Sequence, residues 1–179
     1  LGSTNVWFGT TQGRMYRTND AGLTWNVSQV AATTSTLTEI AFSTPMNGLA
    51  YVVNNTPAFE LWSTSDGGVT WTLIPASPNL GLNDICAVPG TPNFVSVGAG
   101  TGNQIISYSS DFGATWVDYG SINIQYLTVD FADNQSGWAG SFSDNVNPSL
   151  GGIWKYSGSP IGGNTPPLSS FIMPQNLCL

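Results

Sequence analysis

Thr18-Asn19-Asp20-Ala21-Gly22-Leu23-Thr24-Trp25 is the stretch of sequence that decides the fold, because two later stretches repeat its pattern. These are Thr64-Ser65-Asp66-Gly67-Gly68-Val69-Thr70-Trp71 and Ser109-Ser110-Asp111-Phe112-Gly113-Ala114-Thr115-Trp116. All three read Ser/Thr-x-Asp-x-Gly-x-Thr-Trp, and the aspartates follow one another at intervals of 46 and 45 positions. Such a pattern, recurring three times at nearly one period, indicates an internal repeat.

The recurring residue types suit a tight turn between two strands. A carboxylate can accept several backbone N–H groups of the turn, and glycine adopts a positive φ at no steric cost. A β-branched threonine favours the return to an extended strand, and tryptophan buries a large ring while its indole N–H reaches a backbone carbonyl. We therefore expect these residues to stabilise turns and not to form a reactive site. They are Asp20, Gly22, Thr24, Trp25, Asp66, Gly68, Thr70, Trp71, Asp111, Gly113, Thr115 and Trp116.

Short strand-like runs precede each octapeptide, and no segment shows a convincing helical period. Runs of this kind, bounded by Gly, Pro and Asn, predict half-buried strands. Each repeat is thus predicted to hold four short strands, with the octapeptide turn between the third and the fourth. The runs expected as first strands are 37–42, 82–88 and 127–131; as second strands, 6–9, 48–53, 94–98 and 137–140; as third strands, 14–17, 60–63, 104–108 and 152–156.

The repeat is incomplete at both ends of the chain. The first copy begins at Val6, in its second strand, and the last copy has Gly158 where the turn aspartate is expected. Residues 1–158 are therefore predicted to form the repeat region. Residues 159–179 are predicted to be a Gly/Pro/Ser linker followed by a strand-like tail.

The three octapeptides resemble the Asp-box repeats, or bacterial neuraminidase repeats, of sialidase-like β-propellers. This resemblance implies an all-β fold: a β-propeller of four-stranded antiparallel blades, with about four blades present and the first and last incomplete. It also implies that the turns are folding elements remote from any catalytic face. The tail resembles the start of a polycystic-kidney-disease-type domain; alternatively, the tail donates the missing strand within the chain or to a neighbour.

Composition excludes several classes of function. The 179 residues include 3 Lys or Arg, 10 Asp or Glu and no His, and the net charge is −7. Three cations cannot neutralise a run of phosphates, and an anionic membrane would repel the chain, so neither nucleic acid nor membrane insertion is expected. Without histidine, Ser-His-Asp and Cys-His catalysis and His-ligated metals are excluded. The Ser-, Thr-, Asn- and Gly-rich composition is common in secreted proteins, so we expect an extracellular or cell-surface location.

The resemblance to sialidases does not extend to their catalytic residues. Sialidase activity implies an arginine triad, whereas this chain has only Arg14 and Arg17, which we expect on one face of one blade. The repeat also resembles photosystem-assembly propellers, whose arginine patch is missing as well. We therefore predict no catalytic residues of the sialidase type.

A pair of carboxylates could still support glycoside hydrolysis. Glu39, Asp84 and Asp130 are expected at equivalent first-strand positions, so they are candidates for a ligand or Ca²⁺ face. Asp130, with Asp133 and Asp144, offers a second set of oxygen ligands for Ca²⁺. No other cofactor is expected.

Candidate glycosylation sites and the two cysteines bear on the cellular compartment of the protein. Asn26, Asn54 and Asn134 begin Asn-x-Ser/Thr sequences and are candidate N-glycosylation sites in a cell that has the machinery. Cys86 lies in an apolar run, which favours a buried thiol, and a disulfide with Cys178 is the alternative in an oxidising compartment.

Together these observations favour a non-catalytic structural or adhesive module of a surface protein or self-assembling filament. Three architectures stay open: a fragment of a longer polypeptide, a compact four-blade ring, and an assembly completed by strand addition from another copy. The expected partners are other copies, neighbouring domains or glycans. The rival interpretation is a fragment of a glycoside hydrolase or of a carbohydrate-binding propeller.

Overall fold

The computed structural model describes residues 4–54, 59–100, 104–118, 124–142 and 151–162, together with the backbone of 171–172. The regular elements of these residues are all β-strands, which form four antiparallel sheets. The chain divides into two compact units, Leu1–Ala76 and Ser77–Leu179, and each unit contains two of the sheets. The described residues contain no helix that is long and apolar enough to cross a membrane.

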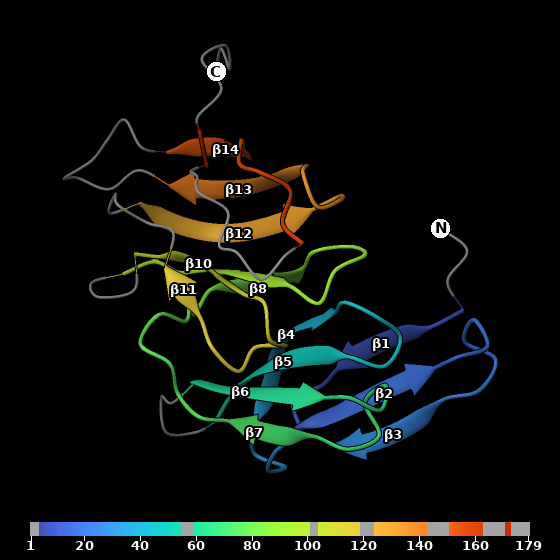
Figure 1. The fold of residues 1–179 in the computed structure, drawn as a ribbon. Coiled ribbons are helices and arrows are strands. Elements are labelled where there is room, and N and C mark those ends of the chain that lie inside the picture. The colour runs from blue at the N-terminus through green and yellow to red at the C-terminus, as the bar shows by residue number, and fades with distance from the viewer. Residues whose placement is uncertain are drawn as a thin grey trace. The chain divides into compact units, whose positions relative to one another are not determined.

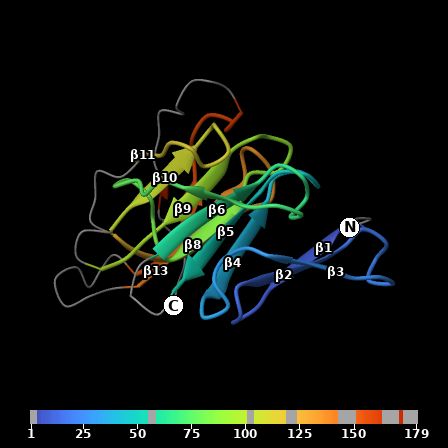
Figure 2. The same cartoon turned by 90° about the horizontal axis from the view of Figure 1, so that it is seen from below.

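The first unit contains a three-stranded sheet and a four-stranded sheet, and in both the strands are paired in chain order (Figure 1). The first sheet is β1 (Val6–Gly9), β2 (Arg14–Thr18) and β3 (Asn26–Gln29). The second sheet is β4 (Thr36–Phe42), β5 (Gly48–Val53), β6 (Phe59–Thr64) and β7 (Thr72–Ile74). The meander of β1, β2 and β3 can be followed from the labelled N-terminus in Figure 2.

The second unit contains two four-stranded sheets. The third sheet is β8 (Asp84–Ala87), β9 (Phe94–Val97), β10 (Ile106–Ser109) and β11 (Val117–Asp118). The fourth sheet is β12 (Gln125–Phe131), β13 (Gly137–Phe142), β14 (Gly152–Tyr156) and β15 (Phe171–Ile172). Strand β15 pairs with β14 through Lys155↔Ile172 and Tyr156↔Phe171, so part of the tail supplies the edge strand of the fourth sheet.

The three octapeptide turns connect the third and fourth strands of their repeats, as the sequence predicts. They join β2 to β3, β6 to β7 and β10 to β11. The first sheet has three strands because β1 corresponds to the second strand of the other sheets. The all-β class and the incomplete first sheet are thereby confirmed.

Each unit has its own apolar core between its two sheets. In the first unit, Met15 of β2 is fully buried among Leu37, Ala50 and Val52 of the second sheet, with Trp7 packed against the same cluster. In the second unit, side chains of both sheets form one cluster: Cys86, Val88, Val95, Val97, Ile106, Tyr108, Ile124, Tyr126, Val129, Phe131, Ala139, Trp154, Tyr156 and Ile161. Burial of these faces against each other is the main stabilising contribution in a fold of this kind.

Candidate functional site

The aspartate of each octapeptide turn accepts hydrogen bonds from both flanking hydroxyl-bearing residues. In the first turn, the Thr18 hydroxyl donates to Asp20 Oδ1 at 2.6 Å, and the Thr24 backbone N–H donates to the same oxygen at 2.9 Å. The Thr24 hydroxyl donates to Oδ2 at 2.5 Å. The same three bonds recur at Asp66 and at Asp111. All three carboxylates are thus engaged within their own turns.

These hydrogen bonds favour the ionised carboxylates. Donation by Thr18, then by the Thr24 side chain and backbone, lowers the pKa of Asp20 from 3.8 to about 2. At Asp66, burial raises the pKa, but donation by Thr70, Thr64 and Val69 outweighs it and brings the pKa to about 2. Asp111 follows the same pattern, with burial opposed by stronger donation from Thr115 and Ser109, and its pKa is lowered. Carboxylates held ionised in this way are suited to stabilising a turn and poorly suited to donating a proton.

The backbone of each turn has two successive residues with positive φ. Gly22, Gly68 and Gly113 have φ values of +91°, +89° and +86°. The residue before each glycine is also left-handed, including Ala21 at +60° and Phe112 at +58°. Sequence reasoning anticipates the glycines but misses these preceding positions, because alanine and phenylalanine give no signal for positive φ.

The tryptophans of the turns are not equivalent. The Trp25 indole N–H donates to the Gly22 carbonyl at 3.1 Å, and Trp116 donates to the Gly113 carbonyl at 3.0 Å. Trp71 Nε1 is buried but has no hydrogen-bond partner, although the ring packs edge-on against Phe42.

The three candidate first-strand carboxylates do not occupy equivalent positions, so that expectation is wrong for one of them. Glu39 and Asp84 each lie three residues before the last pair of their hairpin, Phe42↔Gly48 and Ala87↔Phe94. Asp130 lies only one residue before the corresponding pair, Phe131↔Gly137. The error arises because aligning these runs on their acidic residues ignores the loops that set the strand register.

Asp84 joins two neighbouring sheets of the second unit. Its Oδ2 accepts hydrogen bonds from the Thr128 hydroxyl at 2.7 Å and from the Val129 backbone N–H at 2.9 Å. Its Oδ1 accepts the N–H of Ile85 at 2.7 Å. Asp130 is exposed and accepts the N–H of Phe131 at 2.8 Å. Asp84 thus links strands β8 and β12.

The remaining predicted sites are separate from one another. No group of three or more His, Cys, Asp or Glu side chains able to hold a metal ion occurs among the described residues. Asp133 accepts the N–H groups of Gln135 and Ser136 in a turn, and Asp144 lies outside the described residues. Cys86 is a buried free thiol whose pKa is raised by burial and by the charges of Asp130 and Asp84. Its candidate partner Cys178 lies outside the described residues.

The candidate glycosylation sites differ in their surroundings. Asn26 is exposed at the start of β3, and the hydroxyl of Ser28 in the same sequon donates to the Gly68 carbonyl at 2.6 Å. Asn54 donates to Glu60 at 2.8 Å, and Thr56 of its sequon lies outside the described residues. The Asn134 carbonyl accepts the N–H of Ile161.

Arg14 and Arg17 do not share a face of the first sheet. The expectation that both lie on one face of one blade is therefore wrong. They are three positions apart on β2, and alternate residues of a strand point to opposite faces. Arg17 shares its row with Trp7 and Asn26, on the face that packs toward the second sheet. Arg14 lies on the opposite, outer face with Tyr16.

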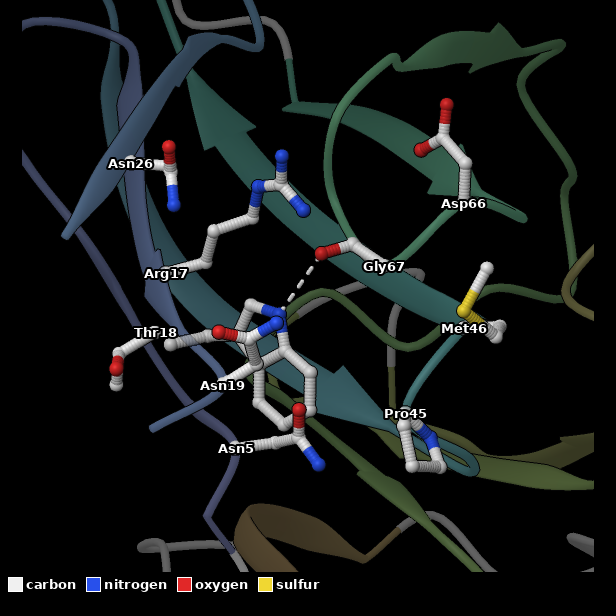
Figure 3. A pocket seen from close by; sticks show the side chains of 10 residues that line it. Asn5, Arg17, Thr18, Asn19, Asn26, Pro45, Met46, Asp66 and Gly67 are labelled. Carbon is white, nitrogen blue, oxygen red and sulfur yellow. Dashed lines mark hydrogen bonds between the residues drawn. The ribbon is translucent and has the colours of Figure 1, made fainter. Parts of the chain in front are cut away.

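A pocket of about 130 Å³ lies at Arg17, between β2 and the loops of the second sheet (Figure 3). Arg17 Nε is buried in the fold and has no hydrogen-bond partner. The Trp7 indole N–H donates to the Gly67 carbonyl at 3.0 Å and forms part of the wall. The lining residues are Asn5, Trp7, Arg17, Thr18, Asn19, Asn26, Pro45, Met46, Asp66 and Gly67.

The outer face of the first sheet, formed by Val6, Phe8, Tyr16 and Val27, is apolar and open. Val6 and Phe8 are each 44% exposed and Val27 is 56% exposed. The Phe8 and Tyr16 rings stack at 5.0 Å, and Trp25 packs edge-on against Phe8. On the equivalent face of the second sheet, Ala50 and Val52 are fully buried against the first sheet, whereas Leu73, the counterpart of Val27, is 49% exposed.

Antiparallel four-stranded meanders of this kind are the blades of β-propellers, and the four sheets define the protein as a β-propeller segment in which the first blade has three strands. The fold is similar to that of YCF48 bound to D1 peptide, with a TM-score of 0.58 and 19% identity over 86% of this chain and 47% of that chain. It is also similar to the GH74 enzyme of Niastella koreensis, with a TM-score of 0.59 and 15% identity over 87% of this chain and 27% of that chain.

A third similar structure is the GH74 xyloglucanase from Xanthomonas campestris, with a TM-score of 0.57 and 12% identity over 91% of this chain and 29% of that chain. This chain therefore spans less than half the length of each of these proteins. At such identities the likeness defines the fold alone. No protein-family model matches the chain, and no curated protein sequence matches it.

Proposed function

We propose that the chain is a non-catalytic structural or adhesive propeller module of an extracellular surface protein or filament. Its first sheet would be covered by a blade of another copy or of a longer polypeptide. The observation that carries this proposal is the exposure of Val6 and Phe8 on the outer face of the first sheet, since their counterparts in the second sheet, Gly48 and Ala50, are buried.

The internal repeat supports a particular kind of cover for this face. In the second sheet the equivalent face packs against the first sheet, and in the fourth sheet Ala139 and Trp154 of the equivalent face are buried in the cluster shared with the third sheet. These contacts support a preceding blade as the partner of this surface. Apolar surface exposed in this way favours association because its removal from water is favourable.

The assignment to Asp-box propellers belongs to this proposal. It is supported by the three turns, in which one carboxylate receives the same set of hydrogen bonds each time. The extracellular location is supported by the low charged fraction of 7% and by the three sequons. YCF48 bound to D1 peptide has a similar fold and binds a polypeptide, which agrees with a protein-binding role.

Sedimentation velocity over a range of concentrations tests the proposal. We expect the wild-type chain to self-associate and Phe8→Asp to weaken that association, because the counterpart of Phe8 in the second sheet, Ala50, is fully buried and a charge would have to be buried in the contact. Val117→Asp is the matched control, since Val117 is 44% exposed on the terminal strand of another sheet. A strictly monomeric wild-type chain, or equal effects of both substitutions, would contradict association through this face.

The second candidate function is a fragment of a glycoside hydrolase, which the likeness to two GH74 structures favours. Hydrolysis of xyloglucan or of another glycan by the chain, abolished by substituting Glu39, Asp84 or Asp130 with the matching amide, would establish it. We expect no hydrolysis, because both oxygens of Asp84 accept protein hydrogen bonds. Binding of glycan without hydrolysis would instead identify a carbohydrate-binding propeller.

A further inference from the structure

We propose that the pocket at Arg17 binds the carboxylate of an Asp or Glu side chain presented by a partner polypeptide. The inference rests on the proposed function only for the source of the carboxylate. Its structural basis is the Arg17 guanidinium, which is one of three basic side chains in the sequence. It forms no ion pair with any described carboxylate, and its Nε atom is buried without an acceptor.

A buried guanidinium N–H without an acceptor has lost its water and gained no hydrogen bond, which is unfavourable. The Nη atoms of Arg17 are not among the buried atoms, and no described residue accepts a hydrogen bond from them. An incoming carboxylate therefore meets the two Nη groups, whose paired N–H bonds match its two oxygens. The pocket offers far more than the roughly 10–15 Å³ that one water molecule needs, so a carboxylate group has room to enter.

The rest of the lining suits the same ligand. Asn19 and Asn26 are exposed at the pocket, and their amides can turn an N–H toward an incoming oxygen. Figure 3 shows the Arg17 guanidinium between Asn26 and the Gly67 carbonyl. The Trp7 ring closes one wall and is held there by its stacking on Phe42, with ring centroids 4.0 Å apart, and by its bond to Gly67.

Two features limit the strength of the site. Asp66 lines the pocket with an ionised carboxylate, although its oxygens already accept hydrogen bonds from Thr64, Val69 and Thr70. The chain has a net charge of −7, so overall charge does not attract an anion. Binding therefore depends on local geometry, and the expected affinity for an isolated carboxylate is weak.

The first experiment titrates the intact chain with acetate and follows the Trp7 indole N–H by heteronuclear NMR. We expect a saturable shift with acetate and none with acetamide or with sodium chloride at equal ionic strength. The Trp154 indole, in the other compact unit, should not move. Equal shifts with acetate and acetamide, or shifts of both indoles alike, would overturn the proposal.

Variants of Arg17 identify the group responsible. Arg17→Gln should weaken acetate binding about tenfold or more, as expected for loss of a charged hydrogen-bond partner. Arg17→Lys keeps the charge but loses the paired N–H groups, so it should also bind more weakly. Arg14→Gln is the control, since Arg14 lies on the opposite face of the same strand. Unchanged binding by both Arg17 variants, in chains with wild-type spectra elsewhere, would overturn the proposal.

The last comparison concerns the source of the carboxylate. A capped Gly-Glu-Gly peptide should bind more tightly than the matched Gly-Gln-Gly peptide and more tightly than glucuronic acid. Tighter binding of glucuronic acid would overturn the polypeptide assignment. Failure of every carboxylate, with self-association intact and still weakened by Phe8→Asp, would reject the pocket inference while leaving the proposed function standing.

Discussion

Asp66 shows how one side chain can define a turn. Its two oxygens receive hydrogen bonds from two hydroxyl groups and from the backbone N–H groups of Val69 and Thr70. Thr64 also accepts the N–H of Gly68 on its own hydroxyl oxygen, so the turn is fastened from both sides. The bonds from the flanking hydroxyl-bearing residues recur at Asp20 and Asp111, which explains why these residue types repeat at a fixed spacing.

The turn carboxylates should make stability depend on acidic pH. Asp20 and Asp66 have a pKa of about 2 in the fold against 3.8 ordinarily, so the fold favours their ionised forms. The stabilisation is therefore present above about pH 4 and is lost as the pH falls toward 2. Thermal denaturation of the wild-type chain should show a falling midpoint over this range. Asp66→Asn should be less stable at neutral pH and should show a shallower fall; parallel curves would contradict this account.

A side chain at a turn glycine should destabilise the fold because the backbone there is left-handed. Gly68 has a φ of +89°, and a Cβ atom there would lie 3.4 Å from the Trp71 ring. We expect Gly68→Ala to cost about 1–2 kcal/mol of unfolding free energy, the usual cost of a left-handed L-residue. Urea denaturation measures this loss. The reverse change at a left-handed alanine, Ala21→Gly, is the control and should destabilise less; equal losses would show that backbone conformation is not the cause.

At the scale of elements, Asp84 holds two neighbouring strands together. Substituting Asp84 with Ala should cost about 1–2 kcal/mol, because the Val129 N–H and the Thr128 hydroxyl both lose an acceptor. Asp130→Ala should have a small effect, since Asp130 is exposed and bonds only to the next residue. A double-mutant cycle of Asp84→Ala with Thr128→Val, measured by denaturation, should give a clear coupling energy. Additive effects of the two substitutions would show that the Asp84 and Thr128 side chains do not interact.

The strands and turns could largely be predicted from the sequence, because alternation and the octapeptide spacing depend on local chemistry. The register could not, because bulges and loop lengths decide it: the pairing shifts between Leu37 and Glu39 and again between Tyr126 and Thr128. The two-residue strand β15 lacks a local signal that distinguishes pairing with β14 from pairing elsewhere. The pocket at Arg17 also escaped prediction, since it depends on residues from both sheets of the first unit.

At the scale of the whole chain, each compact unit has its own core, and damage to one core should be local. Met15 is fully buried in the first unit and Ile106 is 4% exposed in the second. Replacing either with Ala should cost about 2–5 kcal/mol. Amide hydrogen exchange should then show the loss of protection mainly in residues 1–76 for Met15→Ala and in residues 77–179 for Ile106→Ala. Equal losses throughout would indicate a single cooperative fold.

Glycosylation at Asn26 would depend on the host that produces the protein, and it would affect two of the surfaces described above. Asn26 lines the pocket at Arg17, and its neighbour Val27 belongs to the outer face of the first sheet. An oligosaccharide attached at Asn26 would stand beside both surfaces, and it would have to be added before Ser28 takes up its bond to Gly68 in the finished fold. Protein from a host without the glycosylation machinery would expose both surfaces, whereas an oligosaccharide at Asn26 would shield them. Intact-mass measurement of each preparation should therefore precede any comparison of their binding.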